Sequence, residues 1–131
     1  KTYAIFLMNT YSFTCIDLGD TMKTYQDAKN LVRDFFQALE TSSVQEMQSI
    51  LNEYTSADYN FKSVYPFREI TEKHNVAEQF WMPLKQSLTN MQRRMDIFIA
   101  GNNELDDEIW VMCMGHFMGL FENATSALCR I

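Results

Sequence analysis

The distribution of apolar residues predicts strands and helices in a mixed order along the chain. Over Thr2–Ile16, aromatic and β-branched residues alternate loosely with polar ones, and this period of two is typical of a strand. Gln26–Glu40 instead carries its apolar residues at helical spacing along one stripe. Ser43 and Glu46 have the spacing of a capping box, which predicts the start of a short second helix.

The second half of the chain predicts a third helix and an antiparallel hairpin. Tyr54–Phe67 has an extended pattern, and Asn75–Leu88 has a helical one. Pro83 should kink that helix, because its ring removes a backbone donor. Met91–Ala100 and Glu108–Phe121 predict two strands joined by a polar loop. This order predicts an α+β fold in which helices pack on one face of an antiparallel sheet.

Composition and charge exclude several classes of protein. The chain has 131 residues, is 47% hydrophobic and contains no linker, so we expect one domain over residues 1–131. The formal charge is −6 and the only adjacent basic pair is Arg93-Arg94, which argues against nucleic acid as a partner. No run approaches the ~20 apolar residues of a membrane span. Three widely spaced cysteines favour reduced thiols and a cytoplasmic location.

The last predicted strand, Glu108–Phe121, is apolar on both parities. A strand with this pattern is expected to be covered on both sides. His116 is the one ionisable group on its face. It is either a core histidine bonded to a backbone carbonyl or an acid/base group in an apolar pocket.

Asp96 is the single acid of the preceding strand. It is either a solvent-facing charge or a second polar group in the pocket of His116. If the hairpin pairs symmetrically about Glu104, Asp96 lies opposite Met112 and roughly 13 Å from His116 along the strand. That separation is too long for a direct hydrogen bond, and only a β-bulge or a water chain would shorten it.

Aromatic residues and methionines could form an apolar, adaptable pocket lining, although such stripes are more often plain core. We expect Trp81 and Tyr59 to contact the same cavity as Met112 and Met114, because a helix kinked at Pro83 would open space beneath it. His74 and His116 are distant in sequence and match no metal-binding motif, so no metal site is expected. The candidate lining residues are Tyr54, Tyr59, Phe61, Tyr65, Phe80, Trp81, Met112, Met114 and Met118.

Four segments resemble the SnoaL-like polyketide cyclase family of the NTF2-like superfamily. They are Tyr65–Ile70, Ala77–Leu84, Arg93–Ile97 and Met114–Gly119, and Ala100-Gly101 and Trp110-Val111 also match, all within residues 29–121. The resemblance implies a cone in which helices pack against a strongly curved antiparallel sheet around a deep apolar pocket. It also implies acid/base chemistry on polyketide esters that needs neither metal nor organic cofactor.

The resemblance assigns residues as well as a fold. His116 matches the family's strand histidine and Asp96 the acid of the preceding strand, and both face the pocket in relatives. Relatives continue through two further strands, whereas this chain ends ten residues after Phe121, so the match looks truncated. We therefore expect Thr2–Ile16 to cover the open sheet edge, either within the chain or swapped into a second subunit.

These observations leave two hypotheses about function. The first is a binding domain for a small apolar carbonyl or polyketide-like compound, with any catalysis being cofactor-free proton transfer by an isomerase or cyclase. In that case His116 is the acid/base or orienting group and Asp96 is an auxiliary polar group. The alternative is a non-catalytic NTF2-like interaction module whose sheet forms a homodimer.

Overall fold

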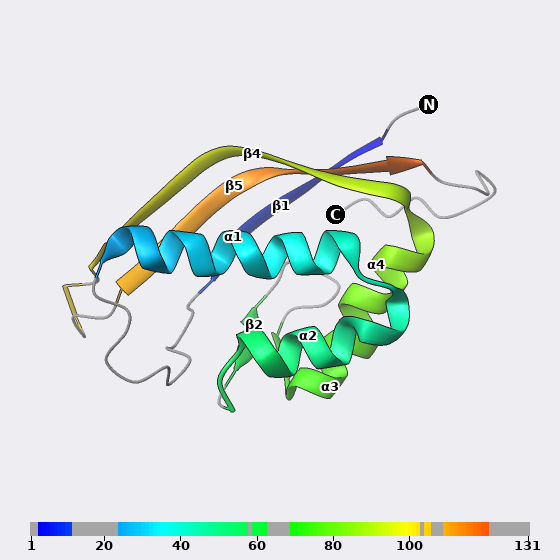
Figure 1. Cartoon of the computed structure of the whole chain (residues 1–131), viewed down its shortest axis with the longest axis horizontal. Coiled ribbons are helices and arrows are strands. Elements are labelled where there is room, and N and C mark those ends of the chain that lie inside the picture. Colours follow the sequence, from blue (N-terminus) through cyan, green and yellow to red (C-terminus); the bar gives the residue numbers. More distant parts are fainter. Residues whose placement is uncertain are drawn as a thin grey trace.

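A computed structural model describes residues 3–11, 24–57, 59–62, 69–102, 104–105 and 109–120. The chain folds as helices plus antiparallel sheets, which confirms the α+β class. No helix among the described residues is long and apolar enough to cross a membrane. In chain order the elements are β1 (Tyr3–Tyr11), α1 (Tyr25–Thr41), η1 (Val44–Glu46), α2 (Met47–Tyr54), β2 (Asn60–Lys62), β3 (Glu69–Thr71), α3 (Lys73–Val76), η2 (Ala77–Trp81), α4 (Met82–Ser87), β4 (Thr89–Asn102) and β5 (Ile109–Leu120) (Figure 1).

The main sheet has three antiparallel strands in the order β1-β5-β4, and it is not closed. β1 pairs with β5 from Tyr3 opposite Gly119 to Tyr11 opposite Val111. The prediction that the N-terminal segment joins the sheet is confirmed for Tyr3–Tyr11, and the pairing is made within the chain. Residues 12–16 of the predicted strand lie outside the described residues.

α1 lies along one face of this curved sheet, and the shorter helices lie near its end (Figure 1). We call this covered side the inner face and the opposite side the outer face. Phe117 of β5 is on the inner face, since its ring lies 6.2 Å from that of Phe36 on α1. Val111 shares its parity and is also buried, whereas Met112 and Leu120 have the other parity and lie on the outer face.

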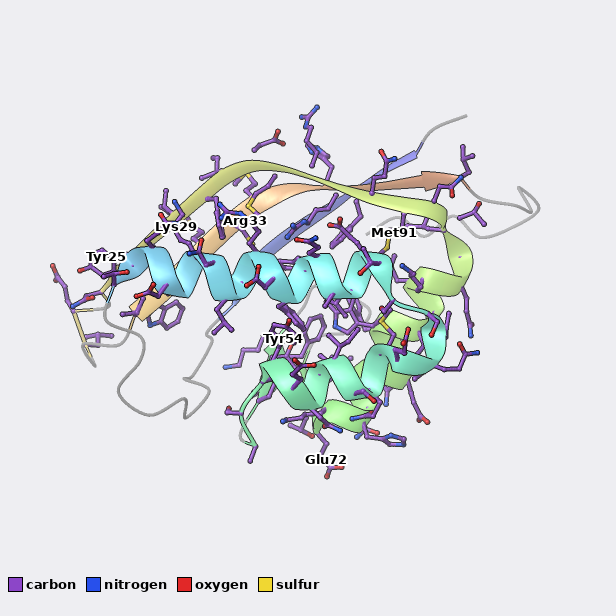
Figure 2. The ribbon with its side chains drawn as sticks, in the orientation of Figure 1. Tyr25, Lys29, Arg33, Tyr54, Glu72 and Met91 are labelled. Atoms are coloured by element: carbon purple, nitrogen blue, oxygen red, sulfur yellow. The ribbon has the colours of Figure 1, made fainter. Side chains whose placement is uncertain are left out.

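The predicted helix Gln26–Glu40 is confirmed as α1, one residue longer at each end. Thr24 caps it by accepting a hydrogen bond from the backbone N–H of Asp27 at 3.2 Å. Lys29 and Arg33 lie on the side of α1 nearest β4 (Figure 2), where they approach the Phe98 ring at 5.1 and 5.3 Å. The predicted apolar stripe supplies the buried residues Ala28, Val32, Phe35, Phe36 and Leu39.

Trp81 is the centre of an aromatic core. Its ring meets Phe35 and Phe36 edge-on at 6.4 Å each, Phe80 at 4.9 Å and Phe117 at 6.1 Å. Edge-to-face aromatic pairs at these distances add to the stabilisation from burial alone. One side chain therefore joins α1, the helical segment before α4, and the inner face of β5.

The capping box predicted at Ser43 is present. The backbone N–H of Ser43 donates to Glu46 Oε2 at 2.7 Å, and the Ser43 hydroxyl donates to the same oxygen at 2.8 Å. Both hydrogen bonds favour the carboxylate and lower the pKa of Glu46. The box begins the short helices η1 and α2.

The helix predicted over Asn75–Leu88 is divided into α3, η2 and α4. η2 is a π-helical turn in which the N–H of Met82 bonds to the carbonyl of Ala77, five residues earlier. Pro83 follows directly, and it has no N–H to give to the carbonyl four residues before it. The wider turn thus takes the place of a simple proline kink.

The extended segment predicted over Tyr54–Phe67 is only partly present. Tyr54 belongs to α2, whose carbonyl at Leu51 accepts a hydrogen bond from the Thr55 hydroxyl at 2.5 Å. The strand itself is short, because β2 covers only Asn60–Lys62 and pairs with β3. Residues 63–68 lie outside the described residues.

Replacing Trp81 with Ala should destabilise the fold by about 3–5 kcal/mol, because a large cavity would remain among four rings. The exposed Tyr25 is the control, and Tyr25→Ala should change stability by no more than about 0.5 kcal/mol. Urea denaturation measures both. Equal midpoints for the two variants would show that Trp81 is not central to the core.

Candidate functional site

The pairing of β4 with β5 has two register shifts, one between Thr89 and Gln92 and one between Met95 and Ile97, and the second leaves one extra residue on β4. Met95 lies opposite Gly115, and Ile97 lies opposite Met114, the preceding residue of β5. Asp96 has no partner of its own in this register. It is therefore the extra residue of a β-bulge, a feature that redirects side chains locally.

The bulge brings Asp96 into contact with His116. His116 Nδ1 lies 3.1 Å from Asp96 Oδ2. The predicted register about Glu104 is wrong, because Ile99 rather than Asp96 lies opposite Met112. The predicted separation of roughly 13 Å fails with it. The observed register differs from the predicted one on both sides of the β-bulge, so the shorter separation comes from the register together with the bulge.

Arg94 completes the cluster. It lies opposite His116 in the sheet, and its Nε and Nη2 donate to the two carboxylate oxygens of Asp96 at 2.8 and 3.2 Å. The hydrogen bond from Arg94 is the main cause that lowers the pKa of Asp96, with smaller contributions from the charges of Arg94 and His116. Asp96 is therefore ionised at neutral pH, so its carboxylate accepts a hydrogen bond from His116 Nδ1–H.

This contact sets the chemistry of the imidazole. When Nδ1 carries the proton shared with Asp96, Nε2 is the basic nitrogen of neutral His116. The His116 side chain is 19% exposed and that of Asp96 is 36% exposed, so the Asp96–His116 pair is partly screened from water.

Large apolar side chains are exposed on the outer face, which also carries the pair. Ile97, Ile99, Met112 and Leu120 are between 41% and 52% exposed. The sequence predicted cover on both sides of β5, but α1 covers the inner face only. We call these four residues the outer apolar patch.

The side chains of Arg93 and Arg94 lie on opposite faces of the sheet, as expected for consecutive residues of a strand. Arg93 points inward, where its guanidinium lies 4.5 Å from the Phe36 ring and its Nε lies 2.8 Å from Glu40 Oε1. Burial lowers the pKa of Arg93, while the charge of Glu40 opposes that shift. This contact is an ion pair that joins α1 to β4, and the N–H of Nε does not point squarely at the carboxylate.

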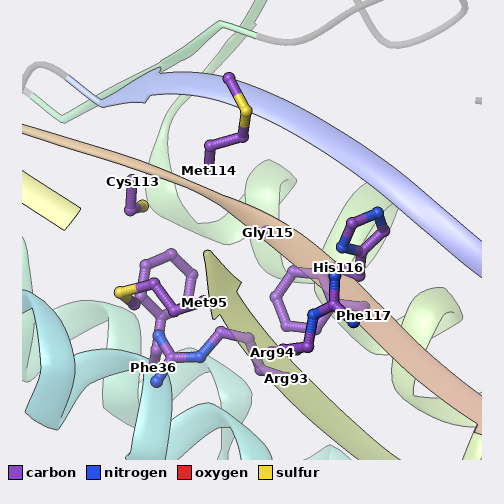
Figure 3. A pocket seen from close by; sticks show the side chains of 9 residues that line it. All are labelled: Phe36, Arg93, Arg94, Met95, Cys113, Met114, Gly115, His116 and Phe117. Atoms are coloured by element: carbon purple, nitrogen blue, oxygen red, sulfur yellow. The ribbon is translucent and has the colours of Figure 1, made fainter. Parts of the chain in front are cut away.

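A small cavity lies on the inner side of the bulge. Its volume is about 30 Å³, which is room for about one water molecule. Pockets for small organic ligands are about ten times larger. In Figure 3, Met114 and His116 point away from Phe36 and Met95, across β5. The cavity is lined by Phe36, Arg93, Arg94, Met95, Cys113, Met114, Gly115, His116 and Phe117.

The structure does not bring the predicted pocket residues together. Trp81 is buried and meets the inner-face residue Phe117, and Tyr59 is buried as well, whereas Met112 and Met114 have outer-face parity. The sheet thus separates the two groups that were expected to share one cavity. The sequence could not reveal this, because both parities of β5 are apolar.

The other predicted lining residues also have definite places. Phe61 and Phe80 are buried, with ring centroids 4.7 Å apart and ring planes tilted by 47°, and the Tyr54 ring lies 5.8 Å from that of Phe35. They belong to the aromatic core. Tyr65 lies outside the described residues, and of Met118 the position in β5 is known.

Sequence reasoning missed Arg94 as part of the site. Arg94 and Asp96 are two residues apart on a predicted strand, a spacing that places both on one face. This spacing is visible in the sequence and would have indicated that Arg94 lies beside Asp96. Among the described residues, no group of three or more His, Cys, Asp or Glu side chains could hold a metal ion.

Comparisons with known proteins add no family assignment. No family model, no curated protein and no solved structure matches this chain.

Arg94→Ala should raise the pKa of Asp96 toward its ordinary value of 3.8 by more than His116→Ala does, because the Arg94 hydrogen bond contributes most. Carboxyl ¹³C NMR titration measures this. Since the folded-state pKa is lowered, the interaction is fully present above pH 3.8 and is lost as the pH falls through the lowered value. A larger effect of His116→Ala would contradict the assignment of Arg94 as the main partner.

Proposed function

We propose that this chain is a binding domain for small apolar carbonyl compounds, related to SnoaL-like cyclases, in which the Asp96–His116 pair transfers protons. The observation that carries the proposal is the 3.1 Å contact between His116 Nδ1 and Asp96 Oδ2. A histidine oriented by a carboxylate is the usual arrangement for a general base. Arg94 holds that carboxylate through both oxygens.

The chemistry follows from the tautomer. Nε2 of His116 removes a proton from the carbon next to the carbonyl group, and the electron pair of that C–H bond moves to form an enolate. The imidazolium is stabilised by Asp96, and it returns the proton to carbon at the same or a conjugated position. The net reaction is hydrogen exchange or isomerisation, and His116 ends in its starting state.

The ligand would bind on the outer face. The inner cavity next to the bulge has a volume of about 30 Å³ and admits no organic ligand. On the outer face, Ile97 is 42% exposed and neighbours Asp96 in sequence. An apolar ligand on this surface would shield the pair further from water and strengthen its electrostatic interactions.

Hydrogen exchange at carbon tests this proposal with 2-tetralone, an apolar bicyclic ketone, as the probe. In deuterated buffer, the protein should accelerate loss of the α-proton signal in the ¹H NMR spectrum. His116→Ala should reduce the acceleration about 100-fold, within the usual contribution of a general base, and Asp96→Asn should also reduce it.

His74→Ala is the matched control. His74 lies on α3, paired with Glu78 at 3.2 Å and remote from β5, so its removal should leave the exchange rate unchanged. Exchange no faster than in buffer, or equal rates for His116→Ala and the unchanged protein, would overturn the proposal.

The outer apolar patch favours a second candidate function, a homodimerisation module. Four large apolar residues are exposed on one sheet face, and such patches mark interaction sites. A second copy is the occupant we propose, because Arg94 and Asp96 place opposite charges on the same face. Across a two-fold axis, Arg94 of one copy can approach Asp96 of the other, so the surface is complementary to itself.

Ile99→Lys should convert a dimer into a monomer, because it places a charge within the patch. Light scattering after gel filtration should give twice the chain mass of 15.4 kDa for the unchanged protein and the chain mass itself for Ile99→Lys. Leu105→Lys is the control, since Leu105 is 94% exposed and lies between β4 and β5. A monomeric unchanged protein at about 100 μM would rule out this candidate.

A further inference from the structure

We infer that Gly115 is a positioning residue for the Asp96–His116 pair. This inference rests on the proposed function, because it concerns how the proposed acid/base group is held. Gly115 lies opposite Met95, directly before His116 on β5. Figure 3 shows it between Met114 and His116, beside the strand that carries Arg94.

There is no room for a side chain at this position. A Cβ atom on Gly115 would lie 2.0 Å from the carbonyl oxygen of Arg94, and 3.0 Å from both the carbonyl carbon of Arg94 and the Cα of Met95. All three are backbone atoms, which cannot turn aside as a flexible side chain can. Gly115 does not have a positive φ, so the requirement is for space and not for a left-handed conformation.

This close approach comes from the bulge. In a regular antiparallel ladder, carbonyl groups lie near the plane of the sheet and Cβ atoms project out of it, so the two do not collide. Here the Arg94 carbonyl oxygen occupies the space that a side chain at position 115 would need, next to the register shift between Met95 and Ile97. The same shift gives Asp96 its unpaired position beside His116. The need for glycine at position 115 and the contact between Asp96 and His116 thus both result from the same β-bulge.

The other two described glycines of the sheet differ from each other in the space around them. At Gly101, a Cβ atom would meet nothing within 4 Å. At Gly119, it would lie 2.9 Å from Leu88 Cβ and 3.2 Å from the Thr89 carbonyl, at the far end of β5. Gly101 is therefore a neutral control, and Gly119 is a control for steric strain on the same strand.

Gly115→Ala should separate Asp96 from His116. The Asp96 pKa should move toward its ordinary value, and the ¹⁵N shifts of the His116 ring should lose the excess of the Nδ1–H tautomer. Gly101→Ala should change neither readout, and Gly119→Ala should lower the urea midpoint without changing either. If Gly115→Ala folds and keeps both readouts, the inference is wrong.

If Gly115→Ala alone does not fold, the same substitution in a variant that lacks Asp96 tests the inference. Deleting Asp96 removes the extra residue and lets β4 and β5 pair regularly. In that background Gly115→Ala should fold with an unchanged urea midpoint. Failure to fold there would show that Gly115 serves general strand packing and would overturn the inference. None of these readouts needs a ligand, so a failed exchange assay refutes the proposed function without touching this inference.

Discussion

The bulge at Asp96 is the constraint on which the rest of the sheet depends. Arg93 and Phe98 have opposite parities, so a regular strand would place them on opposite faces. Both nevertheless face α1, where Arg93 lies over Phe36 and Phe98 lies under Lys29 and Arg33. One extra residue between them resets the alternation. α1 can therefore contact β4 on both sides of the bulge, and the residue that resets the pattern is the acid that meets His116.

Arg93 and Arg94 are adjacent in sequence, but their side chains lie in different electrostatic environments. Arg93 is largely buried, where its charge is balanced by Glu40 and by the face of an aromatic ring. Arg94 is 62% exposed on its side chain and neutralises Asp96 at the surface. The inner pair joins helix to sheet, and the outer cluster fixes the tautomer of a histidine. Adjacent residues of the same type thus contribute to the fold on one face and to chemistry on the other.

Much of this fold follows from sequence pattern. The apolar stripe of α1 and the capping box at Ser43 were predicted, because each is a local or periodic signal. The pairing of β1 with the sheet was predicted because an apolar sheet edge would otherwise be exposed. The exact register of the hairpin was not, since a bulge leaves no unambiguous mark in one sequence. The covered face of β5 was also beyond prediction, because both of its parities are apolar. For that reason the sequence wrongly grouped Trp81 and Tyr59 with Met112 and Met114 around one cavity. Asp96 and His116 were singled out, but their predicted separation was too long.

The most direct test of the account is the register of β4 against β5 in solution. Interstrand backbone NOEs on isotopically labelled protein measure it without any ligand. The bulged register predicts contacts of Arg94 with His116 and of Ile97 with Met114, with Asp96 unpaired between them. Contacts that place Asp96 opposite Met112 would contradict it, because they would remove the bulge, the Asp96–His116 pair and the requirement for glycine at position 115.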